Sequence, residues 1–131
     1  MRYLLGIDIG TYSSKGVLVR ETGEVVASHV VEHPLEVPHP GWAEHDAETT
    51  WWHDFVEITR TLIKNSGVHA AEIAAAGFSA ISSAVLPIDA DGRPLRKAIL
   101  YGIDTRASKE VDELQEISDA YFMVLQWCRS L

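Results

Sequence analysis

Apolar and polar positions alternate in short blocks along the first third of the chain. Residues 3–9 form an apolar run that ends at a glycine, a pattern typical of a short buried strand. Residues 15–20 predict a second strand, and Thr22-Gly23 predicts a hairpin turn into a third strand at residues 24–31. Consecutive strands with such short connections predict an antiparallel three-strand meander.

A helical pattern follows the proline-containing stretch "HPLEVPHPGW", which predicts an ordered loop. Asp46 is a candidate N-cap, and Glu48 lies in the first turn, where the helix dipole favours an acid. The helix is predicted to run to about Asn65 and to stop at Gly67. Its apolar face is predicted to comprise Trp51, Trp52, Phe55, Ile58, Thr59, Leu62 and Ile63.

The second half of the chain predicts further strands and a final helix. Residues 72–82 are typical of a buried strand, residues 83–89 predict the next strand, and "DADGRP" predicts a turn before a strand at residues 97–103. A last helix is predicted from near Thr105. Its apolar face carries Val111, Leu114 and Ile117. Three strands, a helix, more strands and a helix predict an α/β or α+β sheet.

Composition narrows the class of protein. The 131 residues carry a net charge of −8, which argues against general binding to nucleic acid or to anionic membranes. One domain with a real core is expected at this length. The single cysteine, Cys128, cannot form an internal disulfide, so a cytoplasmic location is expected. The sequence shows neither a signal-peptide pattern nor an apolar run of membrane length.

The stretch "GIDIGTYSSKGVLV" places an acid and a glycine turn between two apolar runs. It is not a Walker loop, because the turn leads into a β-branched run and not into a helix. Gly10 lets backbone N–H groups approach an anion, Lys15 adds positive charge, and Asp8 is a candidate magnesium ligand through water. Hydroxyl donors come from Thr11, Ser13 and Ser14. We favour this phosphate hairpin over a hairpin with an incidental acid, since burying an unpaired acid is costly.

Three stretches together resemble the FGGY carbohydrate kinases. The opening strand–"D-x-G-T-x-S-x-K"–strand pattern resembles the first phosphate motif of the sugar kinase and actin superfamily. "HPGWAEHDAETTWW" resembles the FGGY segment before the first long helix, and "AAGFSAISSAVLPIDADGRPLRKAILYGIDTRA" resembles the sugar-binding strand pair. The resemblance covers roughly residues 3–118. It implies an incomplete ribonuclease-H-like (actin-like ATPase) N-terminal lobe, which belongs to a full-length protein that phosphorylates a sugar or polyol with ATP and Mg²⁺.

The resemblance also implies roles for individual residues. Asp8 would lie near the metal, and Gly10, Thr11, Ser13 and Lys15 would face the phosphates. The implied sugar-pocket residues are Ser79, Ser82, Ser83, Tyr101, Asp104 and Arg106. Several family members carry Met-His or Arg-Glu where this chain has its two consecutive serines, so the identity of the sugar does not transfer.

Family members are several times longer than this chain. The resemblance therefore implies that residues 1–131 are part of the N-terminal sugar-binding domain, and that the ATP-binding domain and the general-base Asp lie beyond residue 131. The chain alone is expected to be inactive. It is also expected to form a homodimer or higher oligomer through its incomplete sheet. The apolar ending "AYFMVLQWCRSL" is either a foreign ending or an ordinary helix end.

Structural roles compete with functional ones at several positions. His33, His39 and His45 are interpreted as ordinary loop histidines and not as a zinc site, because cysteines and paired helical spacing are absent. Trp52 is assigned to core packing, whereas Trp42 suits packing and sugar stacking equally.

Alternatives also remain for the last motif and for the protein as a whole. Asp104 and Arg106 are either a sugar clamp, which the resemblance favours, or a salt bridge at a helix start. The preferred function is that of a carbohydrate kinase. The alternatives are a truncated, self-associating module that binds sugar or phosphate without catalysis, and another member of the actin-like superfamily.

Overall fold

The computed structural model describes residues 2–117, which form two compact units. The first unit contains residues 2–35 and 46–81, and the second contains residues 36–45 and 82–117. The apolar ending and Cys128 lie outside the described residues. Between residues 2 and 117, no helix has both the length and the apolar character needed to cross a membrane.

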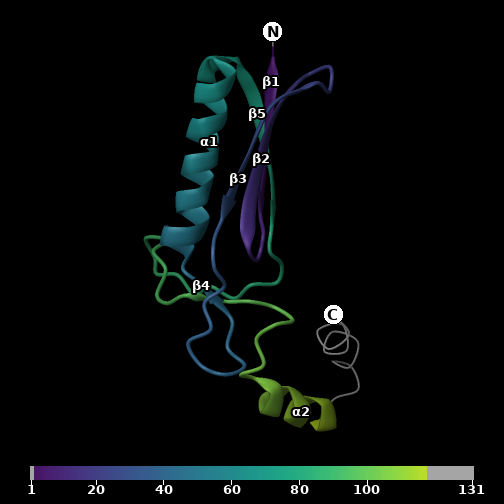
Figure 1. Ribbon diagram of the computed structural model, residues 1–131. Coiled ribbons are helices and arrows are strands. Elements are labelled where there is room, and N and C mark those ends of the chain that lie inside the picture. Colours follow the sequence, from purple (N-terminus) through teal and green to yellow (C-terminus); the bar gives the residue numbers. More distant parts are fainter. Residues whose placement is uncertain (1, 118–131) are drawn as a thin grey trace. The chain divides into compact units, whose positions relative to one another are not determined.

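The first unit is a four-stranded mixed sheet with one helix packed against it (Figure 1). Strands β1 (Tyr3–Ile9), β2 (Ser13–Arg20) and β3 (Val25–Glu32) form the predicted antiparallel meander. Strand β5 (Ile73–Ala80) pairs with β1 in parallel, which gives the order β3-β2-β1-β5. The predicted β2–β3 turn is confirmed, with Gly23 at a φ of 91° that glycine adopts without strain.

Helix α1 (His53–Ser66) covers one face of this sheet. The chain enters it through the π-helical turn η1 (Ala47–Trp52), whose predicted N-cap is confirmed because the Asp46 carboxylate accepts two backbone N–H groups of the turn. The predicted stop is also confirmed, since Gly67 caps the helix in the left-handed conformation with a φ of 68°. The core between helix and sheet comprises Tyr3, Leu5, Ile7, Leu18, Ile58, Leu62 and Val68.

The face that α1 buries is not centred where the sequence predicted. Its buried residues are Asp54, Ile58 and Leu62, which follow one another at intervals of four. The assignment of Trp52 to the core is wrong, because its side chain is 63% exposed and stacks on Phe55 with 5.2 Å between ring centroids. A π-helical turn holds more residues than an α-helical turn, so η1 rotates Trp52 away from the buried stripe.

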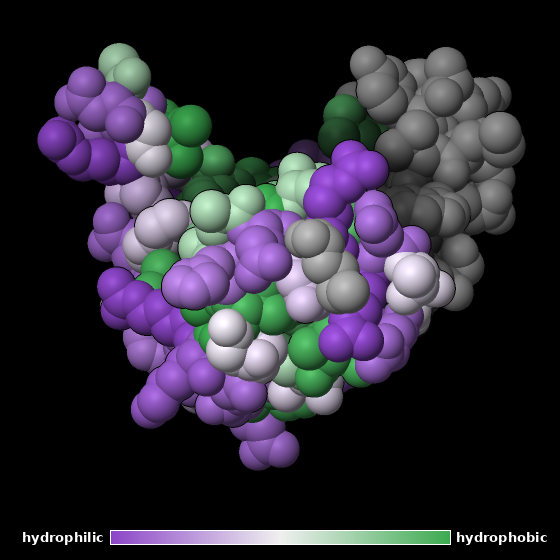
Figure 2. Space-filling view, turned by 90° about the horizontal axis from the view of Figure 1, so that it is seen from above, coloured by the Kyte–Doolittle hydropathy of each residue, from purple (hydrophilic) through white to green (hydrophobic). Residues whose placement is uncertain are grey.

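Strand β5 is exposed, which corrects the prediction of a buried strand. Apart from Ile73, all its residues are exposed, and Phe78 is 65% exposed. The strand lies at the edge of the sheet and pairs only with β1 among the described residues. Figure 2 shows apolar residues (green) at the surface between polar ones. The apolar run does form the predicted strand. It is exposed because no further strand or helix among the described residues covers it.

The second unit contains little strand structure. Strands β4 (Glu44–His45) and β6 (Ala98–Ile99) form a two-residue antiparallel ladder. The strand predicted at residues 83–89 is wrong, because this run makes only isolated bridges, and the strand predicted at residues 97–103 is reduced to β6. Pro87 interrupts the first run, since proline has no N–H for a ladder.

The turn and the last helix of this unit agree with the prediction. The Asp89 carboxylate accepts the N–H groups of Asp91 and Arg93, and Gly92 between them has a φ of 80°. Helix α2 (Ser108–Ile117) begins three residues beyond the expected start.

Candidate phosphate and sugar site

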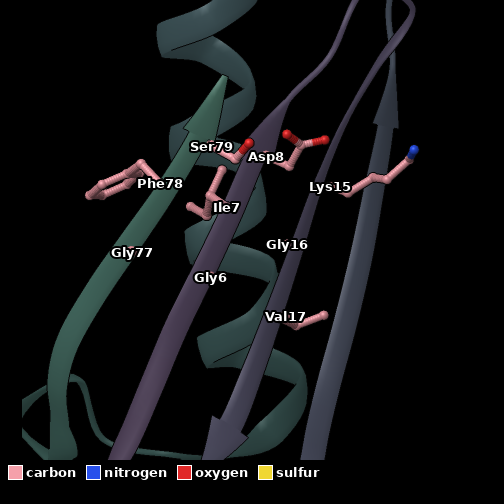
Figure 3. Close-up of a pocket in the computed structure, with 9 residues that line it drawn as sticks. All are labelled: Gly6, Ile7, Asp8, Lys15, Gly16, Val17, Gly77, Phe78 and Ser79. Carbon is pink, nitrogen blue, oxygen red and sulfur yellow. The ribbon is translucent and has the colours of Figure 1, made fainter. Parts of the chain in front are cut away.

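Asp8, Lys15 and Ser79 lie side by side on three neighbouring strands (Figure 3). Asp8 pairs with Lys15 across the antiparallel β1–β2 ladder and with Ser79 across the parallel β1–β5 ladder. Because side chains alternate between the two faces of a strand, all three project from the face opposite α1. A carboxylate, an ammonium group and a hydroxyl therefore meet near the carboxyl ends of β1 and β5.

A depression of about 490 Å³ extends along the sheet from these residues (Figure 3). Gly6 and Gly77 face each other across β1 and β5 in its floor, and Val17 lines its β2 side. Glycines leave the backbone uncovered, so the space beside Asp8 is not filled by side chains. The acid is consequently half-buried and still open to solvent.

The turn that follows β1 has the geometry of an anion site. The Gly10 N–H donates to the Ser13 carbonyl at 3.0 Å, which closes the turn. A Cβ on Gly10 would lie 2.7 Å from the Ser13 carbonyl oxygen, so only glycine fits. The N–H groups of Thr11 and Tyr12 make no backbone hydrogen bond within residues 2–117. The sequence predicted that Gly10 lets backbone N–H groups approach an anion, and in the turn the available N–H groups are those of Thr11 and Tyr12, because the Gly10 N–H bonds to Ser13.

Ser14 was expected to supply a hydroxyl to the phosphate, and this expectation is wrong. It is wholly buried, and its Oγ donates to Asp54 Oδ2 at 2.7 Å beneath the sheet. The pleat explains the difference, because Ser13 and Lys15 flank Ser14 and project to the opposite face. His33 joins the same carboxylate, so the description of His33 as an ordinary loop histidine is also wrong.

The network of Ser14, His33 and Asp54 is the main feature that the sequence analysis missed. One signal was available, because Asp54 precedes Ile58 and Leu62 at intervals of four and so lies on the stripe that α1 buries. An acid at such a position needs partners. Nothing in the sequence pattern indicated that the partners come from β2 and from the residue after β3.

Asp104 and Arg106 form a forked ion pair in the second unit. Arg106 Nε lies 2.8 and 2.9 Å from the two Asp104 oxygens, and Arg106 Nη2 lies 2.6 Å from Oδ2. Nη2 also contacts Glu44 Oε1 at 2.8 Å, and the guanidinium lies 3.8 Å from the centroid of the Trp42 ring. These contacts use the donors Nε and Nη2, so the arrangement shows a structural salt bridge. The sugar clamp stays a prediction.

The same contacts set the protonation of this pair. Burial opposes ionisation of Asp104, but hydrogen bonds from the Arg106 side chain and from the Ala43 N–H outweigh it, so the pKa of Asp104 is lowered. The hydrogen bond to Asp104, assisted by Glu44, raises the pKa of Arg106. The pair is therefore ionised across the physiological range.

The remaining predicted sugar residues are at the surface of the second unit. Ser82 and Ser83 are exposed with their Oγ atoms 3.5 Å apart, and Tyr101 is 37% exposed. Ser79 belongs to the first unit, where it pairs with Asp8. The structure thus places Ser79 beside Asp8 and joins Asp104 to Arg106. A single pocket that contains all six residues remains a prediction.

Comparison with known proteins establishes the family. The chain belongs to the FGGY family of carbohydrate kinases, whose N-terminal domain matches residues 3–125. It is 34% identical to a glycerol kinase of a Nostoc species over 95% of this chain and 28% of that protein. It is also 34% identical to a xylulose kinase of Staphylococcus xylosus over 88% of this chain and 23% of that protein.

Solved structures show the same fold. The xylulose kinase of Rhodospirillum rubrum superposes with a TM-score of 0.81 at 32% identity, over 90% of this chain and 24% of that one. A Plasmodium falciparum glycerol kinase with ADP gives a TM-score of 0.77 at 26% identity, over 91% and 24%. The predicted fold, a partial actin-like ATPase lobe, is therefore confirmed. The chain spans about a quarter of the length of these relatives.

Proposed function

We propose that the protein to which this domain belongs transfers a phosphoryl group from ATP to a hydroxyl of a sugar or polyol. The observation that carries the proposal is the row of Lys15, Asp8 and Ser79 beside the Gly10 turn, at the carboxyl ends of β1 and β5. The family match supports the reaction class. The named relatives act on glycerol and on xylulose, so the acceptor is proposed to be a small polyhydroxylated molecule.

The chemistry of the donors fits a magnesium-bound phosphate chain. Asp8 makes no ion pair or hydrogen bond with the described residues, and no cluster of three metal-binding side chains exists among them. One free carboxylate suits magnesium, which keeps several waters and binds proteins through one or two carboxylates together with substrate phosphates. Bound magnesium would supply positive charge against the transferring phosphoryl group. Asp8 would hold it at the end of β1.

The other residues of this row act on charge and orientation. The N–H groups of Thr11 and Tyr12 would donate to the terminal phosphate, and Lys15 would balance its negative charge. The hydroxyl of Ser79 would lie between the phosphate and the acceptor. Phosphoryl transfer depends mainly on such positioning and electrostatic stabilisation. We further propose that Ser82, Ser83, Tyr101, Asp104 and Arg106 contact the acceptor and that the general base lies outside this chain.

The proposal is tested by titrating the ¹⁵N-labelled chain with magnesium ATP and following backbone amide shifts. Shifts are expected at residues 10–15, and Asp8→Asn should remove the magnesium dependence of binding while leaving the sheet amides unchanged. Lys15→Gln should weaken binding about tenfold, since it removes one charge-assisted contact. Lys64→Gln makes the same charge change in the last turn of α1 and should have no effect.

The opposite results would refute the assignment of the turn. Binding that is equally strong in Lys15→Gln and Lys64→Gln would show that Lys15 does not face the nucleotide. Magnesium dependence that persists in Asp8→Asn would show that another group holds the ion.

A second candidate function is a self-associating module that binds sugar or phosphate without catalysis. The exposed edge strand β5, with Phe78 65% exposed, favours this alternative. Phosphoryl transfer by a longer chain that contains these residues would exclude it.

A further inference from the structure

Three buried side chains lie directly beneath the phosphate turn and take no part in the chemistry proposed above. Ser14 Oγ donates to Asp54 Oδ2 at 2.7 Å, and His33 Nδ1 lies 2.6 Å from the same oxygen. The other ring nitrogen, Nε2, lies 3.1 Å from the Gly10 carbonyl oxygen. Ser14 is wholly buried, and the side chains of His33 and Asp54 are 6% and 2% exposed.

The His33 ring bridges Asp54 and the phosphate turn. One ring nitrogen faces a carboxylate oxygen of Asp54, and the other faces the carbonyl oxygen of Gly10. The contact with Asp54 therefore fixes the ring orientation that reaches Gly10.

This arrangement ties three separate elements to one turn. Ser14 is the second residue of β2, His33 directly follows β3, and Asp54 lies in the first turn of α1. The His33 ring contacts the carbonyl oxygen of Gly10, and the N–H of Gly10 donates to the carbonyl oxygen of Ser13. Both polar groups of the Gly10 backbone are thus fixed from inside the protein.

We propose that Asp54, through His33 and Ser14, positions the phosphate turn so that the N–H groups of Thr11 and Tyr12 stay directed at the anion. The inference rests on the proposed function, because it takes the turn to be the phosphate site. Asp54 and His33 are positioning residues and do not touch the ligand. Loss of the His33 contact frees the Gly10 carbonyl to rotate, and a rotated peptide would present its oxygen to the anion.

His53 provides a matched control. Its Nδ1 lies 3.4 Å from Asp54 Oδ1, and its Nε2 lies 3.8 Å from Glu57, but it makes no contact with the turn. The side chain is 60% exposed. Replacing His53 therefore removes a contact with Asp54 without removing a bond to Gly10.

The test compares His33→Ala, His33→Gln, Asp54→Asn and His53→Ala with the parent chain by NMR. Amide exchange at Gly10, whose N–H is held by the Ser13 carbonyl, reports the order of the turn, the ring ¹⁵N shifts of His33 report its contacts with Asp54 and Gly10, and magnesium ATP is the binding probe. His33→Ala should accelerate exchange in the turn at least tenfold and weaken magnesium ATP about tenfold. His33→Gln should restore part of the protection from exchange and part of the magnesium ATP affinity, because its amide N–H can donate to the Gly10 carbonyl.

Two further readouts separate positioning from a general loss of stability. Asp54→Asn should also accelerate amide exchange at Gly10, because an uncharged amide holds the His33 ring less firmly than a carboxylate does. His53→Ala should leave the turn amides, their exchange and magnesium ATP binding unchanged.

The proposal is overturned if His33→Ala leaves the turn amides as they are, or if Asp54→Asn leaves amide exchange at Gly10 unchanged. Equal effects of His33→Ala and His53→Ala would also overturn it. If magnesium ATP causes no shifts at the turn in a longer chain that also contains the ATP-binding domain, the assignment of the turn as a phosphate site fails. The exchange and ring-nitrogen measurements need no nucleotide, so they decide the positioning role independently.

Discussion

Strand β2 approaches helix α1 closely at Gly16. An added Cβ would lie deep inside the van der Waals envelope of Ile58 Cγ2 and 3.1 Å from Leu62 Cδ1. Both side chains are essentially fully buried. Cγ2 is bonded directly to the Cβ of a β-branched residue, so it moves only if χ1 rotates, and helices restrict that rotation strongly.

Gly16→Ala is therefore expected to destabilise the chain. Overpacking of a dense core typically costs 1–3 kcal/mol, and a cost of about 2 kcal/mol is expected at this site because two buried side chains must yield. For a chain of this length, that loss lowers Tm by roughly 8 °C. Urea unfolding followed by far-UV circular dichroism measures the change as a shift in midpoint at constant m value.

Gly77→Ala is the matched control. Gly77 lies on β5 of the same sheet, and a Cβ there meets no atom within 4 Å. Gly77→Ala should change the free energy of unfolding by no more than about 0.5 kcal/mol. A second test adds Ile58→Ala, which removes the clashing methyl. The double variant should be more stable than the sum of the single changes predicts, by about 1 kcal/mol. Equal stabilities of Gly16→Ala and Gly77→Ala would refute the packing argument.

Three further predictions concern charge, association and activity. Because the pKa of Asp104 is lowered in the fold, its ionised form stabilises the folded state above the unfolded pKa of about 3.9. The stability advantage over Asp104→Asn should thus be present at neutral pH and vanish as the pH falls through the folded pKa; a constant difference in urea midpoint would contradict this. Light scattering should give a homodimer or larger species burying at least about 1,200 Å², weakened by Phe78→Ser, whereas a monomer at high concentration would exclude it. A coupled assay with ATP, magnesium and a sugar panel should detect no turnover by this chain, and turnover abolished by Asp8→Asn would contradict this.

The predictable parts of the fold are those set by local signals. The hairpin turn at Gly23, the N-cap at Asp46 and the stop at Gly67 each depend on one residue and its immediate neighbours. The parts that failed depend on distant partners. The run around Val85 has the composition of a strand, but it makes only two isolated bridges, from Val85 to Ile99 and from Ile88 to Pro94.

The candidate site divides in the same way. Asp8 and the Gly10 turn were predictable because an acid and a glycine interrupt an apolar pattern. The partners of Asp54 could not be predicted from the sequence, because His33 lies 21 residues and Ser14 lies 40 residues away along the chain. The π-helical turn before α1 also made the burial of Asp54 harder to predict. It shifts the helical face that the periodicity assigned from Trp52 onwards.

Strand β2 connects the core to the site through its pleat. Ser14 and Gly16 face α1. Ser14 donates a hydrogen bond to Asp54, and Gly16 has no side chain, which leaves room for Ile58 of the helix. Lys15 between them must then face outward, next to Asp8. A slip of one residue would place the Lys15 ammonium against Ile58 and expose Gly16, so the packing of α1 enforces the register that the site requires. It follows that a change such as Gly16→Ala, which pushes β2 away from the helix, should also displace Lys15 and weaken the contact with phosphate that we propose for it.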